Sequence, residues 1–209
     1  VVAVFASGVA LALTPCVLPQ QYTASVFQWS PNGIPAIPAP PMHQTFAITV
    51  DAPTRRVKLD VNTTLDQYGI SFNNILVFQF YDEKLQYTVE DNGAGNCTVA
   101  TYNEPWFPPV IPDNSTYVGN FRLFKQSDNA YMNTWCANDF GFFQEACFSV
   151  TADTCWPIEL SMKFLDTNST VTYLEQKYYN FEPYTPPAST FQLPPQCPPL
   201  PSPTVSPTM

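Results

Sequence analysis

Charged side chains are scarce in this sequence, since Asp, Glu, Lys and Arg make up only 12% of its 209 residues. A typical globular protein carries about 25%. The charges are also unbalanced, with 8 basic residues against 17 acidic ones and a net charge of −9. Because nucleic acids and anionic membranes are recognised through basic surfaces, this composition excludes a nucleic-acid partner and argues against anionic membranes.

Histidine and glycine are scarce as well, with one histidine, His43, and seven glycines. A serine or cysteine nucleophile activated by histidine would depend on His43 alone. His43 follows a proline-rich loop, where we expect a histidine on the surface or at the start of a strand. No glycine-rich phosphate loop, no HExxH and no GxSxG motif occurs. We therefore expect no catalytic residue and no enzymatic activity.

The cysteines lack the Cys-x-x-Cys spacing, which together with a single histidine argues against a zinc site. Their even number indicates an oxidising compartment and three disulfide bonds. The six residues are Cys16, Cys97, Cys136, Cys147, Cys155 and Cys197.

Four Asn-x-Ser/Thr sequons are present, and none has proline in the middle position. Each is therefore a competent acceptor for an N-linked glycan, and glycans would supply the solubility that the few charges do not. The predicted sites are Asn62, Asn96, Asn114 and Asn168. Sequons and cysteines together predict a secreted, extracellular glycoprotein.

The composition divides the chain into residues 1–13, 14–183 and 184–209. Residues 1–13 are almost wholly apolar, yet too short for a membrane span of about 20 residues. They are either the remnant of a signal peptide or a strand that inserts into a sheet edge of this or a neighbouring subunit. Residues 184–209 contain nine of the 23 prolines, which predicts extended chain. This tail is either a flexible stalk or an ordered, O-glycosylated segment that lies on a partner.

Between these ends the pattern is that of an all-β domain, with strand-like runs separated by Asn-, Asp- and Gly-rich turns. One short helix is expected within residues 129–138. About ten strands at this spacing predict two packed antiparallel sheets or a partly open barrel. The runs are 44–50, 56–61, 75–81, 85–90, 97–102, 117–125, 142–150, 157–165 and 170–181.

Two features of the sequence favour a ligand-binding protein over an enzyme. The acid pairs Asp82/Glu83 and Glu90/Asp91 lie in predicted turns, where acids are solvated, although turn oxygens could hold a calcium ion. The chain is rich in rings, with 16 Phe, 11 Tyr and 4 Trp. Most of these rings belong to the core, and a two-sheet fold with so many large rings can leave an apolar cleft for a lipid-like ligand.

The chain resembles the ependymin-related proteins, which are secreted or lysosomal glycoproteins. The matching segments follow one another in the family's order over residues 15–197. They are PCVLPQQY at 15–22, NCT at 96–98, EPWFPPVIPDNSTY at 104–117, DTCWPI at 153–158 and FEPYTPP at 181–187.

This resemblance implies two antiparallel sheets stacked as a half-open barrel with a deep hydrophobic pocket. It also implies calcium binding, dimerisation and the disulfides Cys16–Cys155 and Cys97–Cys197. The family's cysteine before residue 75 is absent, so Cys136 and Cys147 are expected to form a bridge particular to this chain. No motif identifies the residues that line the pocket.

Two functions are therefore expected for the chain. The first is a carrier that binds a hydrophobic small molecule or lipid in its β-sheet cleft. The second is a structural subunit of an extracellular matrix or filament, a homo-oligomer joined through residues 1–13, because a head-to-tail contact can propagate.

Overall fold

The computed structural model describes residues 14–31, 33–34, 37–38, 42–65, 70–122, 131–140, 143–165 and 171–201. The apolar segment 1–13 and the sequon at Asn168 lie outside these residues. In the described part the regular structure consists of β-strands and three short 3-10 helices, η1 (Ala52–Thr54), η2 (Asp91–Gly93) and η3 (Ala188–Phe191). No described helix has the length and apolarity of a membrane span.

Eleven of the described strands form a single antiparallel sheet in the order β8-β7-β6-β5-β4-β1-β13-β12-β11-β10-β9, and within the described residues β2 pairs only with β3. The strands are β1 (Gln21–Ser30), β2 (Gly33–Ile34), β3 (Ile37–Pro38), β4 (Met42–Asp51), β5 (Arg56–Leu65), β6 (Ile70–Phe80), β7 (Leu85–Val89), β8 (Cys97–Thr101), β9 (Thr116–Arg122), β10 (Tyr131–Phe140), β11 (Phe143–Thr151), β12 (Pro157–Leu165) and β13 (Val171–Pro183).

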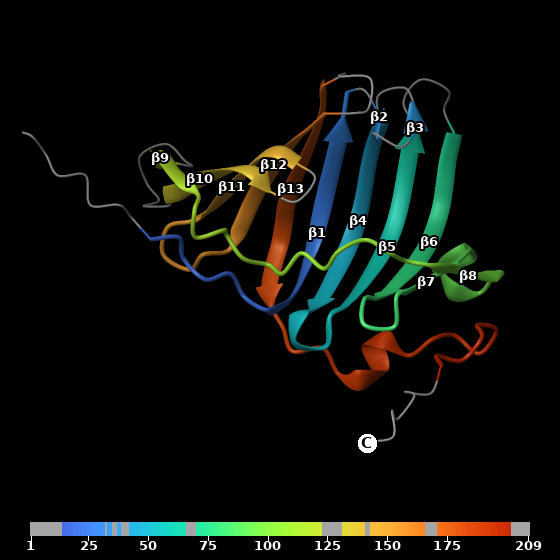
Figure 1. Ribbon diagram of the computed structural model, residues 1–209. Helices are drawn as coiled ribbons and strands as arrows, with labels where there is room; N and C mark the ends of the chain where they lie inside the picture. The colour runs from blue at the N-terminus through green and yellow to red at the C-terminus, as the bar shows by residue number, and fades with distance from the viewer. Residues whose placement is uncertain are drawn as a thin grey trace, which may run out of the picture.

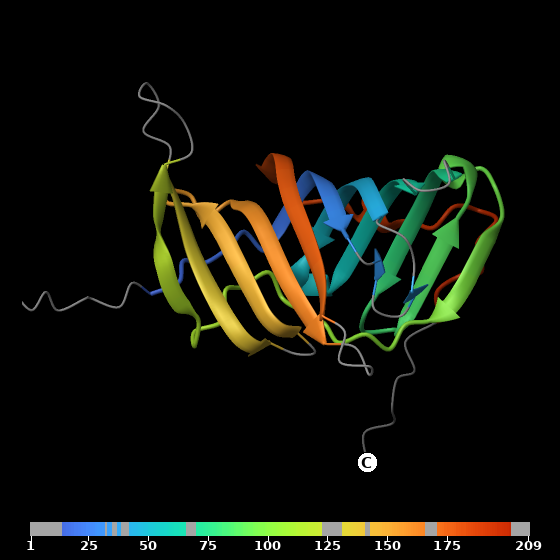
Figure 2. The same cartoon turned by 90° about the horizontal axis from the view of Figure 1, so that it is seen from above.

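The all-β fold class predicted from the sequence is confirmed, and the two expected sheets are continuous with each other. β1 pairs with β4 on one side and with β13 on the other, so it joins the two halves. Figure 1 shows β1, β4, β5 and β6 side by side, with β9–β12 turned away from them. The pairing register shifts in β1–β13, β5–β6, β9–β10 and β11–β12. Such bulges bend strands and increase twist, which accounts for the curvature seen in Figure 2.

Alternation along the strands separates two faces of the sheet, because successive side chains point in opposite directions. In β5, for example, Val57 and Leu59 belong to one face, while Arg56 and Lys58 lie over Phe80 and Phe78 on the other. We call these the inner and the outer face. The chain from β8 to β9 crosses the inner face, and the C-terminal segment covers part of the outer face (Figures 1 and 2).

The proline-rich C-terminal segment, as far as residue 201, packs on its own domain. Phe191 is 5% exposed in a cluster with Phe78, Phe80 and Tyr87. Gln196 donates hydrogen bonds to the carbonyl oxygens of Gly93 and Gly95 at 2.6 and 3.2 Å. The segment therefore covers an apolar part of the outer face between β5 and β8.

The short helix expected within residues 129–138 is wrong, because Tyr131–Phe140 is strand β10. This strand hydrogen-bonds to β9 on one side and to β11 on the other. Trp135 and Ala137, two residues apart, are 2% and 1% exposed. Pairing with the two neighbouring strands, together with the burial of every second side chain, makes this segment a strand, and local propensity does not decide its conformation.

Candidate binding cavity

The strap, which we define as residues 102–115, is the extended connection between β8 and β9. It contains the stretch EPWFPPVIP, whose prolines lack the backbone donor that strand pairing requires. It therefore crosses the inner face without becoming a strand (Figure 1). Side chains hold it in place instead of a hydrogen-bonded ladder.

Three apolar strap residues contact three different parts of the inner face. The Trp106 ring lies edge-on to Tyr81, with 4.8 Å between centroids. The Phe107 ring lies 5.8 Å from that of Phe143. Ile111 is 4% exposed and packs in a cluster with Leu18 and Trp135. The strap is thus anchored along its length, from the β6 side of the sheet to the β10 side.

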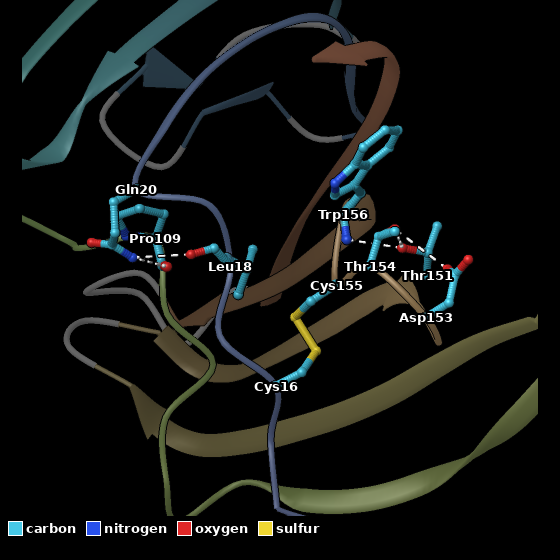
Figure 3. The surroundings of a disulfide bond; sticks show 9 residues. All are labelled: Cys16, Leu18, Gln20, Pro109, Thr151, Asp153, Thr154, Cys155 and Trp156. Atoms are coloured by element: carbon cyan, nitrogen blue, oxygen red, sulfur yellow. Dashed lines mark hydrogen bonds between the residues drawn. A yellow bond between two sulfur atoms is a disulfide. The ribbon is translucent and has the colours of Figure 1, made fainter. Parts of the chain in front are cut away.

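The N-terminal segment 14–20 supports the strap from beside it. The Cys16–Cys155 disulfide ties this segment to the turn between β11 and β12 (Figure 3). The Gln20 amide then donates to the carbonyl oxygens of Leu18 at 3.1 Å and of Pro109 at 3.2 Å. Through Gln20, the disulfide-bonded segment holds the strap at Pro109.

The turn that carries Cys155 is closed by local hydrogen bonds. The Cys155 backbone donates to the Thr151 carbonyl at 3.1 Å, and the Trp156 backbone donates to the Thr151 hydroxyl at 2.9 Å (Figure 3). Cys155 adopts a positive φ of 58°, which points to a backbone held by its surroundings. The turn and the disulfide therefore fix the N-terminal segment to the sheet.

A cavity of about 460 Å³ lies between the strap and the inner face. Ligand pockets in proteins typically have volumes of about 300–1,000 Å³ and mainly apolar walls. Most of the residues around this cavity are apolar or aromatic. They are Leu18, Tyr22, Gln28, Gln44, Phe46, Ile48, Val50, Val57, Leu59, Gln79, Tyr81, Trp106, Phe107, Pro108, Pro109, Val110, Phe143, Ala146, Phe148, Ser149, Val150, Pro157, Glu159, Leu160, Met162, Gln176 and Tyr178.

A row of three glutamines on adjacent strands adds polar groups to the lining, beside Gln79 and Ser149. Tyr178 donates to the Gln176 oxygen at 3.0 Å, and the Gln176 amide donates to Gln28 at 2.7 Å. The Gln28 amide donates in turn to Gln44 at 3.3 Å. Gln28 stands opposite both Gln44 and Gln176 in the strand registers. The row therefore runs across β4, β1 and β13.

The tyrosines beside the cavity stay protonated at physiological pH. Burial raises the pKa of Tyr178 to about 12. Burial, with a smaller contribution from Tyr178, raises the pKa of Tyr22 well above its ordinary value. Burial also raises the pKa of Tyr81, whose hydroxyl lies 3.2 Å from that of Tyr102. All three phenols are therefore neutral groups that can donate a hydrogen bond.

The described lining contains no lysine, arginine or histidine, and its one charged residue is Glu159. Glu159 pairs in register with Lys177, which alternates along β13 with the cavity residues Gln176 and Tyr178. Its carboxylate therefore belongs to the outer face. There, the hydrogen bond that Lys177 donates to Glu175 raises the pKa of Lys177, and Glu159 adds to this effect. The cavity itself is uncharged.

The structure forms all three disulfides expected from the sequence: Cys16–Cys155, Cys97–Cys197 and Cys136–Cys147. Cys97–Cys197 attaches the C-terminal segment to β8, and Cys136–Cys147 links paired positions of β10 and β11. Glu145 lies beside this last pair, whose sulfur atoms are committed to the disulfide.

None of the other predicted residues is among the described residues that line the cavity. Asn96 and Asn114 are exposed before β8 and β9, and Asn62 lies in β5. His43 is in β4 with its ring 5.7 Å from that of Phe27. The acids Asp82 and Glu83 pair with Arg55 and Arg56 at 3.2 and 3.6 Å. Calcium binding stays a prediction.

The sequence identified none of the cavity residues, although two signals could have located them. Phe46, Ile48 and Val50 alternate along β4, and they share the inner face with Val57 and Leu59 of β5. The second signal is the aromatic, proline-rich strap, which the sequence analysis uses as a family motif and which the structure shows to cover the inner face.

No family model and no curated protein matches the chain. Among solved structures, an uncharacterized conserved protein from Thermus thermophilus is similar, with 10% identity, coverage of 83% of this chain and 84% of that one, and a TM-score of 0.48. A LolA superfamily protein from Nitrosomonas europaea has 6% identity, coverage of 83% and 90%, and a TM-score of 0.36. A DUF1329 family protein from Desulfovibrio piger has 7% identity, coverage of 83% and 90%, and a TM-score of 0.34. Membership of the ependymin-related family stays a prediction.

Proposed function

We propose that this protein is a secreted, N-glycosylated carrier that binds one hydrophobic small molecule or lipid between the strap and the inner face of the sheet. The observation that carries this proposal is the cavity of about 460 Å³ with apolar walls beneath a strap anchored by Trp106 and Phe107. Burial of an apolar ligand gains roughly 25 cal/mol for each Å² removed from water. The three disulfides support an oxidising, extracellular setting.

The test is saturable binding of N-phenylnaphthylamine, a neutral fluorescent probe, to the purified full chain. Two variants on neighbouring β4 positions make a matched pair. Ile48→Trp fills the cavity from the inner face, whereas Ala47→Trp places the same ring on the exposed outer face. We expect binding to be lost in Ile48→Trp and kept in Ala47→Trp. Absence of saturable binding by the native chain, or equal binding by the two variants, contradicts the proposal.

A second proposed function, a structural subunit of a homo-oligomer, is supported by a separate observation. Strands β8 and β9 end the sheet in the described part, so each has one unpaired edge. On β9, Val118 is 55% exposed and Phe121 is 46% exposed. Exposed apolar edges are sites where strands of another chain can add.

Light scattering at increasing protein concentration tests this second function. We expect the native chain to form dimers or polymers, and Val118→Lys to shift them towards monomers. Tyr173→Lys, at a 52% exposed position of β13, is the matched control. A native chain that stays monomeric, or equal effects of the two lysines, would rule out assembly through β9.

A further inference from the structure

The glutamine row is an unusual feature for a cavity whose other walls are largely apolar. Gln28 is only 7% exposed. A primary amide buried without partners costs free energy, so it requires hydrogen bonds or a ligand that supplies them. Within the row, the side-chain oxygens of Gln176, Gln28 and Gln44 each accept one hydrogen bond.

The row does not use all of its hydrogen-bonding capacity. Each amide group has two N–H donors and one oxygen that can accept two hydrogen bonds. Gln176 and Gln28 each donate once within the row, and in the described part no bond is donated by the amide nitrogen of Gln44. Donors and acceptors therefore stand side by side in the lining. A ligand group that both donates and accepts, such as a hydroxyl or a primary amide, matches this arrangement.

Charge narrows the choice of ligand further. A carboxylate or phosphate moved from water into this cavity would meet no lysine, arginine or histidine in the described lining. Burial of an ion without a counter-charge is costly, and it costs much more than burial of a neutral polar group. The phenol of Tyr178 is itself neutral, and it is a donor at the end of the row.

We propose that the cavity selects an uncharged amphiphile whose hydroxyl or amide group binds the Gln44–Gln28–Gln176 row, and that it rejects fatty acids and other anionic lipids of the same chain length. This inference rests on the proposed carrier function and names its ligand class. The apolar chain lies against the β4, β5 and β11 side chains, including Ile48 and Leu59. The glutamine row determines specificity for the polar group.

The test is displacement of bound N-phenylnaphthylamine by three ligands with the same alkyl chain: hexadecanol, hexadecanamide and hexadecanoate. We expect the two neutral ligands to displace the probe at concentrations at least about tenfold lower than hexadecanoate, a difference that corresponds to about 1.4 kcal/mol. Equal or stronger displacement by hexadecanoate overturns the inference while leaving the carrier function intact. Failure of the probe itself to bind overturns the carrier function instead.

Variants of the glutamine row test whether the row determines the preference for neutral ligands. Gln176→Met keeps the length of the side chain and removes the amide. We expect the preference for hexadecanol over hexadecanoate, each measured by displacement of the probe from the same variant, to fall at least fivefold. Gln176→Lys adds a cation, and we expect it to favour hexadecanoate. Gln144→Met, at an exposed position of β11, is the control. Unchanged preference in both Gln176 variants contradicts the inference, and Gln44→Met provides the same measurement if either variant fails to fold.

Discussion

The indole ring of Trp106 lies edge-on against the phenol ring of Tyr81, with 4.8 Å between their centroids and 75° between their planes. Tyr81 follows β6 at one end of the cavity, and its hydroxyl lies 3.2 Å from that of Tyr102 at the start of the strap. The two tyrosines and Trp106 thus attach the strap to the sheet on this side. Aromatic pairs of this geometry contribute about 0.5–1.5 kcal/mol beyond the area they bury.

Trp106→Ala should release this end of the strap and weaken ligand binding. We expect the probe's dissociation constant to rise about tenfold, because the variant removes one cavity wall and an anchor together. Fluorescence titration of the full chain measures this constant. Trp106→Phe keeps a ring and should lose much less affinity. Equal affinity of Trp106→Ala and the native chain would show that the strap does not enclose the ligand.

The replacement of Cys97 and Cys197 by serine should free the C-terminal segment from the outer face. The bridge closes a sequence separation of 100 residues, for which the chain-entropy account gives about 4.7 kcal/mol. We expect a loss of about 3–5 kcal/mol in the free energy of unfolding, measured by denaturant titration. Limited proteolysis should then cleave near residues 192–200, next to Phe191. A variant that resists proteolysis there would show that Phe191 and Gln196 hold the segment without the disulfide.

The replacement of Cys136 and Cys147 by serine should lower the free energy of unfolding by less than the replacement of Cys97 and Cys197 does. This bridge closes a separation of only 11 residues between paired positions of β10 and β11, for which the same account gives about 3 kcal/mol. The hairpin retains its backbone ladder, so we expect the smaller loss of the two disulfide variants in the same titration. A loss larger than that of the Cys97/Cys197 variant would contradict this order.

Among the long strands, the sequence predicted β5 and β6 and missed β1 and β10. β5 was predictable because Val57, Leu59 and Val61 alternate with polar residues. β1 was missed because both of its faces mix apolar and polar residues. Phe27 lies on the outer face with Ser25, whereas Val26 lies on the inner face with Gln28. β1 joins the two halves of the sheet. Without it, the sequence does not show whether the other strands form one sheet or two.

The cavity could not be predicted for a related reason. It depends on which strands are neighbours, and the register that aligns Gln28 with Gln176 joins positions 148 residues apart in the chain. Local periodicity shows which side of a strand is apolar, whereas it does not show what lies across the sheet. The pairs Cys16–Cys155 and Cys97–Cys197 were predictable only because the family resemblance supplied them, and Cys136–Cys147 was predicted as a bridge that the family lacks.

Asn96 and Asn114 are the two sequons whose side chains the structure places in exposed positions. Exposed turns and strand starts are accessible to glycosylation, so we expect a glycan on each when the chain is expressed through a secretory pathway. Asn96→Gln and Asn114→Gln should each lower the mass by one glycan, as measured by intact mass spectrometry. Treatment with an N-glycosidase is the control and should remove both differences. Unchanged mass in either variant contradicts glycosylation at that site.

Stability at alkaline pH should depend on the tyrosines beside the cavity. Burial raises the pKa of Tyr178 to about 12 in the folded chain, from about 10 when unfolded. The folded state therefore retains the proton longer than the unfolded state, and this contribution to stability is complete below pH 10 and lost as pH rises from about 10 to 12. Tyr178→Phe also removes the hydrogen bond to Gln176, which lowers stability equally at every pH below 10, so the informative quantity is the slope of stability against pH.

Denaturant unfolding at stepped pH should give a shallower alkaline decline for Tyr178→Phe than for the native chain, with exposed Tyr173→Phe as the control. Identical slopes for the two variants would show that the Tyr178 phenol is not the group that folding keeps protonated.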